Sequence, residues 1–288
     1  DTHSINPKVF LKMAVSVECT LRYTLAEETG FVFQIQAAAA EKQTISKEAI
    51  SIPICASNAF FTAYTDPVTC SRVIRAMLGP GDVEVNYKAT VNIDPTNFDP
   101  YKVEEFEFTD LPMQYLTYLA PSRYCPSDVF SEFAFETFGA MPRGYNRVVA
   151  VCNWIYANIT YTMGSTGPNS NAVDVFQSRE GVCRDFAHLG IALCRAIGVP
   201  TRYASVYAVG LFPQDFHAIF QAYLKGPDGG AWFSFDPTRM SSVAEIVRIA
   251  AGRDAADVAF AWPQGEAKSD APIVVVLNRP WIVGGSNS

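Results

Sequence analysis

The sequence predicts an α+β protein, with an N-terminal antiparallel β domain followed by a domain in which helices pack on an antiparallel sheet. Three successive patterns in the sequence support this. Apolar and polar residues alternate through most of residues 1–109, apolar residues recur at helical spacing from about residue 122, and alternation returns after residue 200. We therefore predict three parts: residues 1–109, residues 110–262, and a C-terminal tail strand at 263–288.

The N-terminal domain is predicted to consist of strands. Alternating segments at 15–25 and 31–37 flank a turn near Glu28–Gly30, and a longer strand follows the Gly-Pro-Gly turn at 79–81. One face of that strand carries Val83, Val85, Tyr87, Ala89 and Val91. Several prolines and an acidic stretch at 95–112 indicate the linker.

The second domain is predicted to begin with helices. Ser127–Asp128 can cap the first of them, and the second, at about 145–158, carries an apolar stripe at 3/4 spacing. A short helix within 172–181 precedes a strongly apolar helix that starts at Cys183 and is stopped by Gly198.

Strands follow these helices. Period-2 segments occupy 201–211, 217–224 and 231–236, and residues 225–230 have the composition of a hairpin turn. The apolar segment at 272–279 can add a strand to either domain.

The composition is that of a folded globular protein. Of the 288 residues 49% are hydrophobic and 18% charged, and the formal net charge is -7. An acidic chain without basic runs argues against nucleic acid and anionic membranes as partners. No apolar run approaches the roughly 20 residues that span a bilayer, and we expect no signal peptide.

The seven cysteines are widely scattered. Their odd number and the absence of a C-x-x-C pair argue against a disulfide framework and against a zinc site. We therefore expect no metal, no cofactor and a reducing, cytoplasmic compartment.

Cys183 differs from the other cysteines in its position. It follows Gly181 at the first turn of the apolar helix, where unpaired backbone N–H groups and the helix dipole favour a thiolate. The same N–H groups can bind an oxyanion. Cys194, in the middle of the helix, is expected to be buried and inert.

The sequence has three histidines. His3 is near the beginning of the chain, and His188 lies five residues beyond Cys183 on the helix, which turns it away from the cysteine. His217 begins a predicted strand and Asp236 ends the next one. If these strands form a hairpin, the carboxylate can hold the imidazole in place. Cys183, His217 and Asp236 are therefore the candidate nucleophile, base and orienting carboxylate.

With these residues in view, the chain resembles a known family. The segments GVCRDFAHLGIALCRAIGVPTRY, DFHAIFQAYL and WFSFDPTRM are similar to the bacterial transglutaminase-like superfamily, which includes candidate cysteine proteases. The likeness spans roughly residues 110–262. It implies a papain/transglutaminase-like catalytic domain and carries the family's triad onto Cys183, His217 and Asp236. Family members often have H-A-W where this chain has His217–Ala218–Ile219, which alters the pocket and leaves the triad intact.

Four further residues are candidates for substrate or oxyanion binding. Trp154 and Tyr161 precede the cysteine and can supply a second oxyanion donor, although core packing is the alternative for Trp154. Asp185 can bind substrate or act as a structural carboxylate at the helix start. Tyr203, on the strand after the helix, can line the pocket or pack beneath it. His188 is expected to pack.

The predicted chemistry is attack of the Cys183 thiolate on an amide carbonyl to give a thioester. Water would then make the protein a peptidase, and a second amine would make it a protein-glutamine transglutaminase. Two other hypotheses are a non-catalytic binding or scaffolding module and acetyl transfer from a thioester donor, for which we find no phosphate-binding glycine-rich loop. We expect a peptide or protein substrate, and an exposed sheet edge would favour a homodimer.

Overall fold

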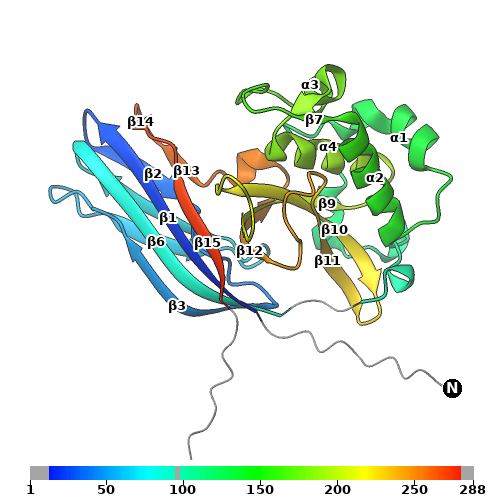
Figure 1. Cartoon of the computed structure of the whole chain (residues 1–288), viewed down its shortest axis with the longest axis horizontal. Helices are drawn as coiled ribbons and strands as arrows, with labels where there is room; N and C mark the ends of the chain where they lie inside the picture. The colour runs from blue at the N-terminus through cyan, green and yellow to red at the C-terminus, as the bar shows by residue number, and fades with distance from the viewer. Residues whose placement is uncertain (1–12, 95–97, 280–288) are drawn as a thin grey trace, which may run out of the picture.

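The computed structural model describes residues 13–94 and 98–279. A β sandwich lies beside a layer of helices packed on a four-stranded antiparallel sheet (Figure 1). This confirms the α+β class that the sequence predicts. Residues 1–12, which include His3, lie outside the described residues. The prediction that they form no signal peptide concerns this segment. None of the helices in the described part of the chain is both long and apolar enough to cross a membrane.

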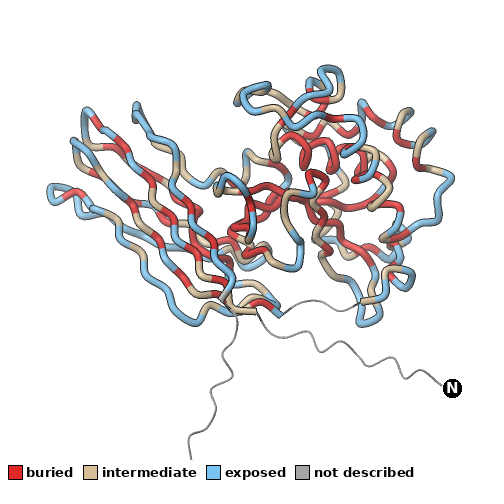
Figure 2. The backbone as a smooth tube through the Cα atoms, viewed as in Figure 1, coloured by how far each residue is buried: buried red, intermediate tan, exposed pale blue. Residues whose placement is uncertain are grey.

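The sandwich consists of two antiparallel sheets. In the first the order is β14-β1-β6-β3, with β15 also paired to β1, and in the second it is β13-β2-β5-β4. Its N-terminal strands are β1 (Met13–Leu25), β2 (Thr29–Phe33), β3 (Gln43–Ser51), β4 (Phe61–Thr65), β5 (Arg72–Leu78) and β6 (Gly81–Ile93). Burial alternates along β1 and β6 (Figure 2). Every second side chain of these strands therefore points into the space between the two sheets.

The C-terminal segment completes the sandwich. β13 (Ala261–Pro263) pairs with β2, β14 (Lys268–Ser269) pairs with β1, and β15 (Ile273–Arg279) also runs antiparallel to β1. The predicted tail strand therefore joins the sheet formed by the first residues of the described chain. The division into three parts stays a prediction.

The sheet on which the helices pack has the strand order β11-β10-β9-β12. Its strands are β9 (Thr201–Ala208), β10 (His217–Gly226), β11 (Gly229–Phe235) and β12 (Ile246–Gly252). The predicted hairpin is present, because Gly226 pairs with Gly229 around a two-residue turn. The sequence did not predict β12, which pairs with β9 and closes the other side of the sheet.

The helices are α1 (Ser131–Phe138), α2 (Tyr145–Asn158), α3 (Ala172–Ser178) and α4 (Cys183–Ala196). Short 3-10 helices occupy Pro100–Lys102, Phe108–Asp110, Met113–Tyr118, Ser127–Phe130 and Ala255–Asp257. A two-stranded parallel pair, β7 (Thr160–Tyr161) and β8 (Glu180–Gly181), joins the end of α2 to the start of α4.

The central helix α4 is buried along most of its length and packs on the sheet. A glycine makes this close approach possible: a Cβ atom on Gly190 would lie 2.5 Å from Cε1 of Phe220, on β10. The buried residues of α2 are Val148, Val151, Cys152 and Ile155, which form the stripe expected from 3/4 spacing, and Arg147. α4 is thus held between the other helices and the sheet, and Cys183 and Arg184 at its start are partly exposed.

A buried ion pair fixes the linker to the helices. Glu105 and Arg147 have side chains only 2% and 4% exposed, and they are joined by hydrogen bonds. Arg147 also donates to the carbonyl of Ile197, just after α4. The linker, α2 and the end of α4 are therefore held together at one point.

Candidate active site

The chain enters α4 through Val182, whose backbone is extended, and Cys183 is the first helical residue. Asp185 accepts a hydrogen bond from the N–H of Val182 at 2.9 Å, which satisfies one of the unpaired groups at the helix start. Cys183 is partly exposed, whereas Cys194 on the same helix is fully buried. Of these two cysteines, the one at the helix start is therefore the more accessible.

Asp185 is a structural carboxylate in this arrangement. Besides Val182, it accepts hydrogen bonds from the hydroxyl of Thr166 at 2.5 Å and from the guanidinium of Arg184 at 3.0 Å, and it is 1% exposed. A Cβ atom on Gly181 would lie 2.8 Å from the Cβ of Asp185. Its oxygens are used by the protein, so they brace the turn that precedes the cysteine.

Tyr161 is brought to the cysteine by the short parallel pair. Tyr161 pairs with Gly181, and the N–H of Thr162 donates to the carbonyl of Gly181 at 2.9 Å. The Tyr161 hydroxyl lies near Cys183, whose thiol and backbone N–H both affect its pKa. Burial, followed by the nearby Cys183, raises the pKa of Tyr161 to about 12, so the hydroxyl keeps its proton and can donate it in a hydrogen bond.

His217 and Asp236 come from neighbouring strands. His217 is the first residue of β10, and Asp236 directly follows the last residue of β11. Nε2 of His217 lies 2.9 Å from Oδ2 of Asp236, and the two side chains are 1% and 2% exposed. Cys183 lies close enough to the imidazole to raise its pKa, and Nδ1 is the ring nitrogen that does not bond to Asp236. The structure thus brings together all three residues of the predicted triad.

The electrostatics of the pair favour an imidazolium. Burial alone lowers the pKa of His217, but the hydrogen bonds and charges of Asp236 and Cys183 outweigh it and raise the pKa to about 9. Burial acts to raise the pKa of Asp236, and the hydrogen bonds from His217 and Thr238 overcome it, so this pKa lies below its usual value. Both groups are charged at neutral pH in this environment.

Asp236 is held by the loop that follows it. Oδ1 accepts hydrogen bonds from the N–H and the hydroxyl of Thr238 at 2.9 and 2.6 Å. Oδ2 accepts the N–H and hydroxyl of Ser241 at 3.2 and 3.1 Å, in addition to His217. This cradle was not predicted. The sequence Asp236-Pro237-Thr238 could have indicated the bond to Thr238, because an Asp side chain often accepts the N–H of the residue two positions further on. Nothing in the sequence indicated Ser241.

Two of the predicted binding residues lie in packed environments. Trp154 stacks on Phe176 with ring centroids 5.7 Å apart and receives the guanidinium of Arg179 at 5.3 Å. Tyr203 is 6% exposed and lies against the ring of His188 at 5.2 Å. Cys183 raises the pKa of both Tyr161 and Tyr203, so both hydroxyls lie near the cysteine, and Tyr161 is the more exposed of the two.

His188 is enclosed by its neighbours. It is fully buried, its ring stacks on Tyr124 at 5.1 Å, and its Nε2 accepts the N–H of Ala255 at 3.1 Å. Burial, with the nearby Arg184 and Arg195, lowers its pKa well below the usual value, so it is neutral. These contacts give it a packing role.

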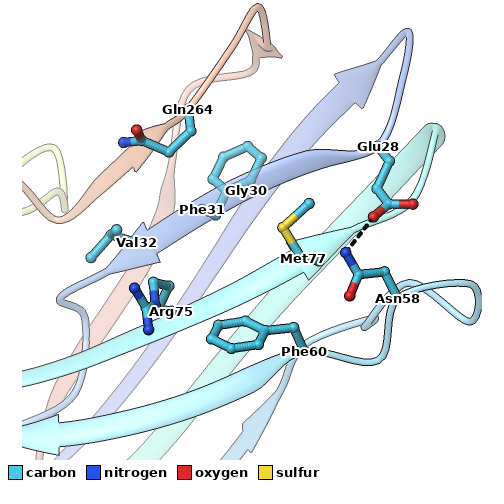
Figure 3. Close-up of a pocket in the computed structure, with 9 residues that line it drawn as sticks. All are labelled: Glu28, Gly30, Phe31, Val32, Asn58, Phe60, Arg75, Met77 and Gln264. Atoms are coloured by element: carbon cyan, nitrogen blue, oxygen red, sulfur yellow. Dashed lines mark hydrogen bonds between the residues drawn. The ribbon is translucent and has the colours of Figure 1, made fainter.

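No group of three or more histidine, cysteine or acidic side chains suited to a metal ion occurs within residues 13–94 and 98–279. A hollow of about 760 Å³ lies elsewhere, on the sandwich (Figure 3). Its lining includes Phe60, Arg75, Met77 and Gln264, and Arg75 stacks over Phe60 at 4.9 Å. It contains none of the candidate catalytic residues.

Helices on an antiparallel sheet, beside a β sandwich, define a protein with a transglutaminase-like core. The model of the transglutaminase-like superfamily matches residues 131–237. A candidate cysteine protease from Cytophaga hutchinsonii is 35% identical, with a TM-score of 0.85, and the match covers 96% of this chain and 93% of that one. The chain belongs to the transglutaminase-like superfamily.

Mycobacterial proteins are also similar. An uncharacterized protein of Mycobacterium leprae is 30% identical over 172 residues, which are 56% of this chain and 60% of that protein. One from Mycobacterium tuberculosis is 35% identical over 115 residues, or 36% and 37% of the two chains. The match thus spans 60% of the length of the first of these relatives and 37% of the second.

Proposed function

We propose that this protein is a cysteine-nucleophile amide hydrolase, a peptidase that acts through a thioester intermediate. The observation that carries the proposal is that Cys183, at the start of α4, lies near the hydrogen-bonded pair of His217, which begins β10, and Asp236, which follows β11. The similarity to the candidate cysteine protease over nearly the whole chain supports the same class of activity. The substrate proposed is a peptide or protein amide.

The first half of the reaction forms the thioester. His217 holds the proton of the Cys183 thiol, and the thiolate attacks the carbonyl carbon of the substrate. The oxyanion that forms receives hydrogen bonds from the backbone N–H of Cys183 and, we propose, from the Tyr161 hydroxyl. As the tetrahedral intermediate collapses, the C–N bond breaks and the imidazolium of His217 gives its proton to the leaving amine.

The second half restores the enzyme. Neutral His217 takes a proton from a water molecule, which attacks the thioester carbonyl. The C–S bond then breaks, the acid product leaves, and the proton returns to the sulfur–imidazole pair. Asp236 keeps the imidazole oriented throughout and stabilises its charged form.

The experiment that tests this proposal is selective alkylation combined with turnover. Iodoacetamide at pH 6 should label Cys183 faster than an ordinary thiol, because an imidazolium lies beside it. Cys183→Ala should abolish labelling at this site and hydrolysis of a peptide library while the melting temperature stays close to that of the wild type. Cys70, the other partly exposed cysteine, provides the control: the Cys70→Ser variant should keep both the labelling of Cys183 and the hydrolysis of the peptide library.

The same assay separates hydrolysis from transamidation. Peptide substrates containing glutamine are incubated with and without a primary amine, and the products are identified by mass spectrometry. Acid products in both cases support the peptidase. Products that incorporate the amine would assign the chain to the transglutaminases instead. If Cys183 reacts no faster than a free thiol and no turnover is found, the result would favour the non-catalytic binding module.

A further inference from the structure

A side chain near His217 ties the candidate active site to the sandwich. Gln214 lies three residues before the histidine and faces the outer edge of β15. Its Nε2 donates to the carbonyl of Val276 at 3.0 Å, and its Oε1 accepts the N–H of Val276 at 2.9 Å. One side-chain amide therefore forms hydrogen bonds with both the N–H and the carbonyl of a strand residue, as a neighbouring strand would.

The position of Val276 makes this contact specific. Val276 pairs with Val17 of β1, and a residue in an antiparallel ladder directs its N–H and its carbonyl to the same side. At Val276 both groups point away from β1, toward an edge that no other strand of the described residues covers. The residue is 2% exposed, so a side chain that covered these two groups without bonding to them would leave both buried without partners.

The segment that carries Gln214 leads directly into the histidine. β9 ends at Ala208 and β10 begins at His217, so residues 209–216 form the connection. Its middle is open to solvent, since Phe212 is 89% exposed. At its end Phe216 stacks on Phe260 with ring centroids 4.4 Å apart. Between these two aromatic residues, Gln214 supplies directional hydrogen bonds to another element.

We propose that Gln214 is a positioning residue, which fixes His217 relative to Cys183 by clamping the connection onto β15. This inference rests on the proposed function, because it assigns a role in the same reaction. The C-terminal strand is then part of the active-site framework, even though it contributes no reacting group. An imidazole displaced by a fraction of an ångström still binds protons but transfers them less efficiently to a substrate.

Gln214→Met tests the clamp, because methionine has a similar length and cannot make either hydrogen bond. We expect kcat to fall on the order of 10- to 100-fold with KM little changed. We also expect the pH at which Cys183 alkylation steps up to move by about half a unit or more, since the imidazole no longer stands at the same distance from the sulfur. The kinetic constants and the alkylation profile are measured on protein that a denaturation curve has shown to be folded.

Gln264→Met is the matched control, because Gln264 lines the hollow on the sandwich and the same substitution there should leave kcat and the alkylation profile unchanged. If Gln214→Met does not fold, Gln214→Glu serves instead, because it keeps an acceptor for the Val276 N–H and loses the donor. A purely structural contact predicts lower stability with an unchanged kcat and pH profile for the folded protein.

The two proposals fail in different ways. A wild type that turns over, together with a Gln214 variant that keeps its kcat and alkylation profile, overturns the positioning role and leaves the hydrolase intact. A wild type without selective alkylation or turnover overturns the proposed function and the positioning role with it.

Discussion

Nε2 of His217 and Oδ2 of Asp236 are 2.9 Å apart, although one residue begins β10 and the other lies just beyond β11. The ladder between these strands pairs Phe220 with Phe235. Asp236 is therefore past the end of β11, and the loop containing Thr238 and Ser241 turns its carboxylate toward the histidine. Strand pairing brings the two residues near one another, and the loop sets the hydrogen bond.

The activity should have a descending limb at alkaline pH. The imidazolium of His217 protonates the leaving amine in the proposed mechanism, and its raised pKa of about 9 means that this proton is present below that pH and lost above it. We expect kcat/KM to fall as the pH rises through about 9. The measurement is kcat/KM against pH with an uncharged substrate. A limb near the ordinary histidine value would contradict it.

Asp236→Asn should weaken catalysis and shift this limb. The substitution removes the negative charge that raises the pKa of His217, while burial continues to lower it, so the limb should move to lower pH. Turnover should fall on the order of 10²- to 10⁴-fold with the fold retained. The pH profile of the variant and an NMR titration of the histidine ring check this. An unchanged limb would remove Asp236 from the role of orienting carboxylate.

Tyr161→Phe tests the second oxyanion donor. The change keeps the ring, which contacts Phe186 at 5.8 Å, and deletes only the hydroxyl beside Cys183. We expect kcat to fall roughly 10- to 1000-fold with little effect on KM. Trp154→Phe, in the aromatic cluster with Phe176, is the control and should retain kcat once stability is taken into account. Equal effects of the two substitutions would contradict the assignment.

His188→Ala should affect stability and leave the chemistry unchanged. It removes the acceptor of the Ala255 N–H and the stacking on Tyr124. We expect the free energy of unfolding to fall by about 2–4 kcal/mol. Urea denaturation measures this loss, and kcat is compared per folded molecule. Loss of turnover in a folded variant would show that the role assigned to His188 is wrong.

Gly190→Ala should destabilise the packing of α4. Alanine favours the helix by at most about 1 kcal/mol, but its Cβ would lie 2.5 Å from Phe220, and overpacking of this kind costs about 1–3 kcal/mol. We therefore expect a net loss of stability in thermal or chemical denaturation. Phe220→Leu in the same protein should recover part of the loss in a double-mutant cycle, because it makes room for the methyl group. Additive effects would contradict the clash.

Much of the candidate site could be predicted because its signals are local. Cys183 follows a glycine at the start of an apolar helix, and His217 and Asp236 flank a hairpin whose turn is evident from its composition. The helix predicted at about 145–158 is α2, Tyr145–Asn158. Each of these predictions depends on patterns within a few residues of the chain.

The contacts that hold these residues in place had no such signal. Ser241 and Gln214 bond to groups that are distant in sequence or approached only through a folded loop. β12 was missed because its residues form a mostly buried edge strand without clear alternation.

By itself, the sequence determined the type and order of most elements and the three residues that carry the proposed chemistry, because periodicity, turn residues and helix starts act over short distances. Only the tertiary structure decided that β15 joins β1 and that its free edge receives Gln214. Strand partners are selected by the burial and hydrogen bonding of the whole fold. A single apolar segment such as 272–279 is compatible with more than one sheet until the rest of the chain is in place.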